Sequence, residues 1–458
     1  MKKTICFIFI IIFLVIVLGV LIKLNVDEMN NKAVSKTASQ DMPEPPSDGK
    51  SKEKNGGKSS ANVSYSGKTE IKENAEISSQ SYSSEDADEN AVLVNGDINV
   101  SLNDVTVNKT GDSDGGDNTS FYGINSAIIA KDGANLTIEN ADIETNATGA
   151  NGVFSYGGSA TTNNLSSDGT TVSIRNSKIT TTKDNSGGIM TTGGGKMIAN
   201  NLTINTAGIS SAAIRTDRGG GDVTVTGGIY RTTGKGSPAI YSTADIKVSD
   251  AELVSKSSEG IVIEGKNSVS IDNCTLTDSN TSLNGKSSTY KNIFLYQSMS
   301  GDAANGTAEF TAKDSTITTN NGDSFYITNT KATINLTNNE IINNDKDGYF
   351  LRAQKDSWGN EGSNGGDVTL NMTKQEVVGN IVIDEISTLE MNMEESSYFE
   401  GTINGDNTAK SITLKLDSTS KIKLTGDTYV TSLEDVDLEY SNIDFNGYKL
   451  YVNGVAIN

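Results

Sequence analysis

Histidine is absent from this chain of 458 residues, and cysteine is nearly so, since only Cys6 and Cys274 occur. Two cysteines are too few for a disulfide framework, and without histidine no Cys/His set can hold a metal ion. The sequence therefore excludes a small disulfide-stabilised domain and a zinc site of the Cys/His type.

Aromatic residues make up 6% of the chain and hydrophobic residues 34%, which is little for a compact globule. A solenoid with a narrow core needs less. Proline is also scarce, and three of the four prolines are Pro43, Pro45 and Pro46. Glycine, asparagine, serine, threonine and aspartate are abundant instead. These residues favour turns and exposed strands over helices.

The formal net charge is −21. Nucleic-acid binding needs a basic face, so nucleic acid is excluded as a partner. The glycine-rich runs do not join a strand to a helix in a phosphate-binding sequence, and we therefore expect no nucleotide either.

The N-terminus has the features of a membrane anchor. Lys2 and Lys3 precede an unbroken apolar run over residues 5–22. As a helix this run would be about 27 Å long, just enough to cross the core of a bilayer. No small-x-small cleavage site follows it, so we predict an uncleaved signal anchor, a transmembrane helix over residues 1–23. The polar residues 24–66 predict a disordered linker. The remaining chain would then lie at the extracellular face of the membrane, or be secreted if the run is cleaved.

The clearest pattern is a repeated motif, in which a turn-forming residue stands between two apolar residues, as in Ile174–Asn176–Ile179. The turn residue recurs at Asp104, Asn140, Asn176, Asn201, Gly227, Asp250, Asn273, Asp314 and Asn338, with weaker copies at Lys374, Glu395 and Tyr440. Most copies stand about 21–26 residues apart, and longer steps fit one period with loop insertions. A repeat of this length indicates a solenoid.

The strand before each turn alternates between apolar and polar residues. The pairs that we expect to point inward are Val100/Leu102, Leu136/Ile138, Val172/Ile174, Val223/Val225, Ile246/Val248 and Val269/Ile271. Between them stand residues such as Ser101 and Thr137, which would face outward because strand side chains alternate. With three short strands per turn, the sequence predicts an all-β fold, a single-stranded parallel β-helix of 12–13 coils over residues 67–458. Its turn residues should stack as a ladder.

The coil motif, the glycine-rich turns at 193–195 and 219–221, and the Ser/Thr/Asn-rich strands resemble secreted right-handed β-helix proteins of the pectate-lyase-like superfamily. The nearest likeness is to surface-exported β-helix proteins of clostridia and their relatives, some of which bind carbohydrate. The resemblance covers residues 68–458. It implies right-handed winding, which the usual hand of parallel crossovers also favours, and the cell surface of a Gram-positive bacterium. Hydrolases of this fold carry paired aspartates and a catalytic histidine, and this chain has neither.

The first strand of each coil carries candidate binding residues. Ile128, Val153, Ile189, Ile214, Ile240, Ile261, Ile293 and Phe325 should face inward, and their next neighbours, many of them rings, outward. The binding candidates are Phe154, Tyr156, Arg215, Tyr241, Phe294, Tyr296, Tyr326 and Trp358. Exposed, these rings would form a stacking platform for sugars. Alternatively, insertions cover these rings as a second core layer, or the strand is inverted and the rings point inward. The candidate insertions are 108–122, 157–169, 279–290, 298–307 and 355–366. Trp358, in the last insertion, would either stack on a sugar or pin its loop.

Charged residues supply candidates for chemistry. Arg215, Arg218 and Lys196 fall on neighbouring coils, and a polysaccharide lyase of this fold would need such a base, usually with Ca²⁺. The alternative is ion pairing with Asp217 or Asp222. Asp112, Asp114 and Asp117 lie in one glycine-rich loop and would either bind Ca²⁺ or remain a solvated acidic loop.

The sequence thus predicts a membrane-anchored extracellular β-helix that binds a polymer, a polysaccharide or cell-surface glycan, or acts as an adhesin. We expect no catalysis and no cofactor other than, at most, Ca²⁺. A pectate-type polysaccharide lyase and a structural surface stalk are the alternatives.

Overall fold

A computed structural model describes residues 63–158, 167–285 and 287–458, all within one compact unit, Pro45–Asn458. The predicted signal anchor over residues 1–23 and the linker up to residue 62 lie outside the described residues. In the described part the only helix is α2 (Asp117–Tyr122), and it is far too short to cross a membrane.

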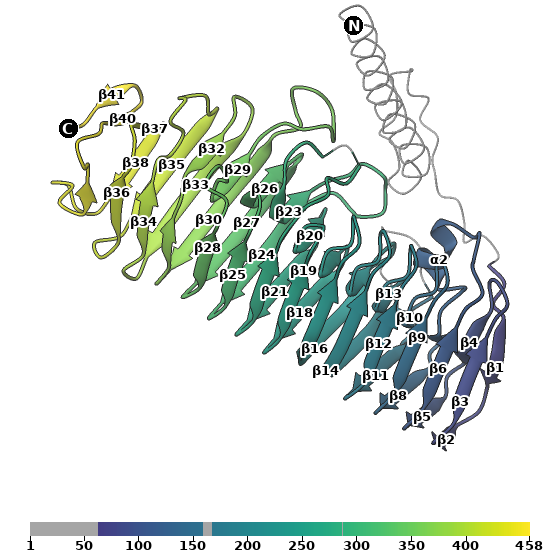
Figure 1. Ribbon diagram of the computed structural model, residues 1–458. Coiled ribbons are helices and arrows are strands. Elements are labelled where there is room, and N and C mark those ends of the chain that lie inside the picture. Colours follow the sequence, from purple (N-terminus) through teal and green to yellow (C-terminus); the bar gives the residue numbers. More distant parts are fainter. Residues whose placement is uncertain (1–62, 159–166, 286) are drawn as a thin grey trace, which may run out of the picture. The chain divides into compact units, whose positions relative to one another are not determined.

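Strands follow one another in sequence order along a continuous stack (Figure 1). The first strands of the coils form a twelve-stranded sheet of β1 (Gly67–Ile71), β4 (Asn90–Asn95), β7 (Ile128–Lys131), β10 (Val153–Tyr156), β13 (Ile189–Thr192), β15 (Ile214–Thr216), β17 (Ile240–Ser242), β20 (Ile261–Glu264), β23 (Lys291–Tyr296), β26 (Asp323–Thr328), β29 (Leu351–Ala353) and β32 (Ile381–Ile383).

The second and third strands of most coils belong to a twenty-two-stranded sheet. Its second strands are β2 (Ala75–Ser78), β5 (Asn99–Asn103), β8 (Asn135–Glu139), β11 (Thr171–Arg175), β18 (Asp245–Ser249), β21 (Ser268–Asp272), β24 (Thr307–Lys313), β27 (Thr330–Thr337), β30 (Gly366–Thr373), β33 (Thr388–Glu394), β35 (Ser411–Leu416) and β38 (Ser432–Asp435). Its third strands are β3 (Ser81–Ser84), β6 (Thr106–Lys109), β9 (Asp142–Thr145), β12 (Lys178–Thr181), β19 (Glu252–Ser255), β22 (Thr275–Asp278), β25 (Thr316–Thr319) and β28 (Glu340–Asn343), while β14 (Gly195–Thr206) and β16 (Gly221–Thr232) span both positions.

Toward the C-terminus the third strands continue in a separate four-stranded sheet, and three further strands close the series. The four are β31 (Glu376–Val378), β34 (Tyr398–Gly401), β36 (Lys421–Leu424) and β39 (Ile443–Asp444), and the three are β37 (Thr428–Val430), β40 (Leu450–Val452) and β41 (Val455–Ala456). Neighbouring strands run parallel, and only the last pair, β40 and β41, is antiparallel among the described strands. The predicted all-β stack of parallel strands is confirmed, and its architecture is that of a parallel β-helix.

The turn residues adopt the conformation that the repeat requires. All twelve turn residues of the motif have a positive φ, from 48° at Asp314 to 68° at Gly227. Glycine enters this left-handed region freely, and Asn and Asp tolerate it. The predicted ladder is present where two such side chains meet. For example, Asn273 Nδ2 donates to Asp250 Oδ1 at 2.7 Å, and Asn201 Nδ2 donates to Asn176 Oδ1 at 3.0 Å.

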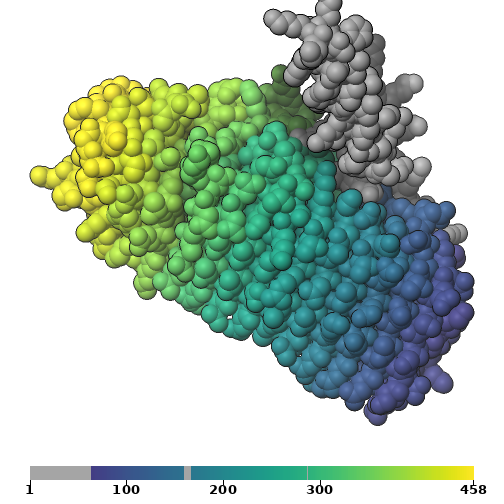
Figure 2. All heavy atoms as spheres, in the orientation of Figure 1, coloured from purple at the N-terminus to yellow at the C-terminus, as the bar shows by residue number. Residues whose placement is uncertain are grey.

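Equivalent residues of successive coils stack in register. Ile174, for instance, lies between Ile138 of the preceding coil and Ala199 of the next. The inward pairs predicted in the second strands all belong to one buried core, and the intervening Ser101 and Thr137 are partly exposed. In the space-filling view the colours follow one another as bands in sequence order (Figure 2). Each coil therefore packs mainly on its two neighbours, as in other solenoids.

The described chain has more coils than the 12–13 predicted, because the second strand recurs fourteen times, from β2 to β38. The motif search missed the coil between Glu395 and Tyr440. There the turn between the second and third strands is longer and has no left-handed residue. Instead, Asp417 Oδ1 accepts hydrogen bonds from the backbone N–H groups of Thr419 (3.0 Å) and Ser420 (2.8 Å).

Candidate functional site

The outward rings of the twelve-stranded sheet are covered, apart from Tyr241, which is only partly buried, so the predicted exposed platform of rings is wrong. Phe154, Tyr156, Phe294, Tyr296 and Tyr326 are each at most 8% exposed. Their inward neighbours, from Ile128 to Phe325, form the central core, so the predicted orientation of the strands is confirmed and the inverted arrangement is wrong. The alternative in which insertions cover the rings describes the structure.

Two separate clusters make up this second layer. The N-terminal ring cluster consists of Leu93, Phe121, Tyr122, Ile124, Ile129, Phe154, Tyr156 and Met190, with Tyr65 packed against it. Its cover is α2, from the insertion at 108–122. The C-terminal ring cluster consists of Val262, Phe294, Tyr296, Tyr326 and Trp358. Trp358 is 6% exposed, and its ring centroid lies 5.4 Å from those of Phe294 and Tyr296, so it pins the loop at 355–366.

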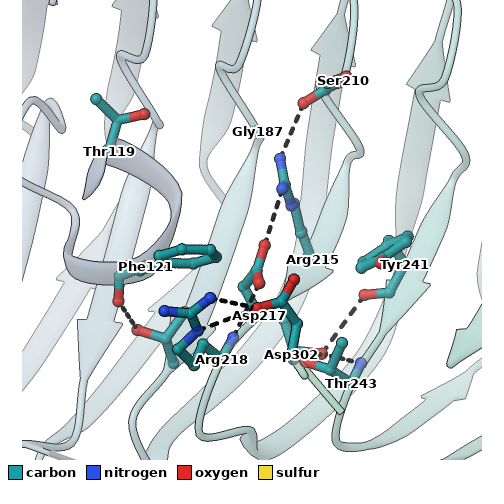
Figure 3. A network of polar contacts seen from close by, with 12 residues as sticks. Thr119, Phe121, Gly187, Ser210, Arg215, Asp217, Arg218, Tyr241, Thr243 and Asp302 are labelled. Carbon is teal, nitrogen blue, oxygen red and sulfur yellow. Dashed lines mark hydrogen bonds and ion pairs between the residues drawn. The ribbon is translucent and has the colours of Figure 1, made fainter. Parts of the chain in front are cut away.

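Between the two clusters lies a polar patch, which we define as Arg215, Asp217, Arg218, Tyr241, Glu264, Ser298 and Asp302. Figure 3 shows Arg215, Asp217, Arg218, Tyr241 and Asp302. Arg215 of β15 donates through Nη2 to Asp217 Oδ2 at 2.8 Å and through Nη1 to the carbonyl oxygen of Ser210 at 2.9 Å. Asp217 is 4% exposed, and burial raises the pKa of its carboxyl group although Arg215 opposes the shift. Arg215 is therefore engaged in a buried pair.

Arg218 follows β15 and contacts two insertions. Its Nε and Nη2 both donate to Asp302 Oδ1, at 3.0 and 2.6 Å, and its Cζ lies 3.9 Å from the centroid of the Phe121 ring. Both arginines thus have carboxylate partners within the patch. An arginine held in this way by a carboxylate is not the free base that a lyase needs.

Glu264, at the end of β20, accepts hydrogen bonds from three hydroxyl groups. Tyr241 Oη donates at 2.6 Å and Tyr296 Oη at 3.2 Å to Oε2, and Ser298 donates to Oε1. The residue is 1% exposed, and burial raises the pKa of its carboxyl group, against the lowering effect of Ser298 and Tyr241. Ser298 and Asp302 tie the loop at 298–306 to the sheet at two points.

A groove follows the corner between the first and second strands of the coils, and we call it the corner groove. It consists of three hollows of about 330, 550 and 640 Å³. Gly219 and Gly221 line both the first and the second hollow, and Thr307 lines both the second and the third. The hollows thus adjoin, and their lining is mostly Gly, Ser, Thr, Asn, Asp and Lys.

The remaining candidates lie apart from the polar patch. Lys196 is exposed and lines the 330 Å³ hollow beside Asp222. Asp112 Oδ1 accepts a hydrogen bond from the backbone N–H of Thr148 at 2.7 Å, and Asp117 begins α2. Across the described residues no group of three or more acidic, histidine or cysteine side chains is placed to hold a metal ion, so the structure does not bring the three aspartates together as a Ca²⁺ site.

Sequence reasoning missed Glu264 and Asp302 as members of the site. Glu264 did carry a signal, because it is a carboxylate at an outward position of the same strand series as Tyr241 and Tyr296. Asp302 carried none, since it stands in an insertion outside the repeat. Comparison with protein-family models, with curated proteins and with solved structures found no match.

Proposed function

We propose that the protein is a non-catalytic binder of a polysaccharide or cell-surface glycan, and that the polymer lies in the corner groove. The observation that carries the proposal is the alignment of three adjoining hollows along one corner, from the coil of β10 to that of β32. These nine first strands make eight steps of about 4.8 Å, or about 38 Å in all. A groove of that length is far longer than one sugar ring and suits a linear chain.

The lining supports a hydroxyl-rich ligand. Side chains such as Ser268, Asn267 and Thr307 present donors and acceptors along the groove. The glycine turn at 219–221 leaves room for a ligand to approach the backbone. The rings lie beneath the covers rather than in the groove, so polar contacts would carry recognition.

Membership of the right-handed pectate-lyase-like group, a membrane anchor at residues 5–22 and a place at the extracellular face of a bacterial cell belong to the same proposal. All three rest on the sequence pattern, and the parallel coils fit the first of them, the group resemblance. The pairing of Arg215 and Arg218 with carboxylates favours binding over lyase chemistry.

Retention on a panel of insoluble polysaccharides (cellulose, chitin, xylan and calcium polygalacturonate) tests the proposal. We expect at least one to retain the protein without release of unsaturated product, as followed by ultraviolet absorbance. Thr307→Trp places a large ring between two hollows and should weaken retention at least about tenfold, a loss of about 1.4 kcal/mol. Thr275→Trp, on the exposed face of β22, is the matched control and should bind normally. Equal retention of both variants, or no retention on any polymer, would refute the corner groove as the binding site.

A further inference from the structure

Two covers of the twelve-stranded sheet meet at one side chain. The first cover is α2, which carries Phe121, and the second is the loop at 298–306, which carries Asp302. Arg218 lies between them, with Phe121 on the face of its guanidinium group and Asp302 at its edge (Figure 3). The covers are far apart in the sequence, and the contacts of Arg218 join them.

Each cover also has an attachment of its own. For α2, Thr192 Oγ1 donates to the carbonyl oxygen of Phe121 at 2.8 Å, and Tyr65 Oη donates to that of Tyr122 at 2.9 Å. For the loop, Ser298 donates to Glu264. Loss of one contact of Arg218 would therefore loosen a cover without detaching it.

The backbone of Arg218 is fixed while its side chain depends on the two covers. Its N–H donates to Asp217 Oδ1 at 2.9 Å, and its carbonyl oxygen accepts from the N–H of Gly193 at 3.1 Å. The side chain is 34% exposed. Asp302 holds the guanidinium plane against the Phe121 ring, and the ring in turn shields the ion pair from water on one face. Removal of either partner frees the arginine to turn into solvent.

We propose that Arg218 couples the two covers, so that opening of the loop at 298–306 loosens α2 and opening of α2 loosens the loop. Such a coupling is reciprocal by thermodynamic necessity. Asp302 also lines the 550 Å³ hollow. A ligand that moves the loop would therefore also affect α2 and, through Phe121, the N-terminal ring cluster. The coupling is a property of the free protein and holds whether or not a polymer binds in the groove.

Hydrogen–deuterium exchange on the full chain tests the coupling. Asp302→Ala should speed exchange in α2 (residues 117–122) at least about fivefold, which is the factor that the weakest typical coupling between two sites produces. Phe121→Leu keeps an apolar side chain and should speed exchange in the loop at 298–306. Glu252→Ala is the matched control, because Glu252 pairs with Arg231 at 2.7 Å on an exposed face remote from both covers.

The two reciprocal variants make the outcome decisive. If Asp302→Ala accelerates exchange in its own loop alone, or Phe121→Leu in α2 alone, the covers are independent and the proposal is wrong. A variant that exchanges faster throughout the coils has lost global stability, and the other variant then decides. Circular dichroism identifies that case before exchange is measured.

Discussion

At the scale of single residues, Glu264 shows how burial sets a protonation equilibrium. It lies near Asp217 and Asp302, so burial and like charge both raise the pKa of its carboxyl group, and the hydroxyl groups of Tyr241 and Ser298 oppose the shift. In the unfolded chain the pKa of a glutamate carboxyl group is about 4.3. Above that pH the folded state holds the proton more tightly than the unfolded state, so stability falls as pH rises through the folded pKa.

Glu264→Gln removes this titration and keeps an oxygen acceptor for the hydroxyl groups. We expect the free energy of unfolding of the variant, relative to that of the wild type, to increase as pH rises from 4 toward 8. Urea melts across that range measure it. Glu76→Gln, at an exposed position of β2, serves as the control and should show no such trend. A difference between Glu264→Gln and wild type that stays constant with pH would contradict the raised pKa.

At the scale of the element, the turn between second and third strands costs stability where its left-handed residue is not Gly, Asn or Asp. Lys374 has a φ of 52°, a conformation that costs a residue other than Gly, Asn or Asp about 1–2 kcal/mol. Its ion pair with Glu395 at 3.3 Å is exposed and contributes little. Lys374→Asn should therefore raise the free energy of unfolding by about 1 kcal/mol.

Urea unfolding of Lys374→Asn measures this gain. Lys421→Asn changes the same residue type at an exposed strand position in β36 and should be neutral or destabilising, because asparagine is a poor strand former. A Lys374→Asn variant that is less stable than wild type would show that the turn conformation is not the limiting term.

The same turns explain what the sequence could predict. A left-handed residue between two inward aliphatics leaves a local signature, and each of the twelve turns found that way has the expected backbone. The motif search missed the turn at Asp417 because there the Asp417 side chain caps the backbone and no left-handed residue is needed. The covers could not be fully predicted from the sequence for a different reason. Whether a ring at Phe154 or Phe294 is exposed depends on an insertion from another coil, and no period in the sequence records that contact.

At the scale of the whole described unit, stability should be a sum over coils and their nearest-neighbour interfaces. Deletion of residues 394–416 removes one complete coil, with β34 and β35, and joins Met393 to Asp417. Because Leu416 pairs with Met393 in register, the new junction restores the original turn and stacks equivalent residues again. We expect a folded protein with a slightly lower melting temperature and an unchanged circular-dichroism spectrum per residue.

Deletion of residues 394–407 is the matched control, since it removes about half a coil. Thr413 would then take the inward place of Phe399, so the aliphatic residues Ile412, Leu414 and Leu416 would face away from the core. Each such residue contributes about 1.5–3 kcal/mol when buried. This variant should therefore unfold cooperatively at a much lower temperature or aggregate. If both deletions melt alike, stability is not organised coil by coil, and the corner groove would then depend on contacts that span the stack rather than on the repeat itself.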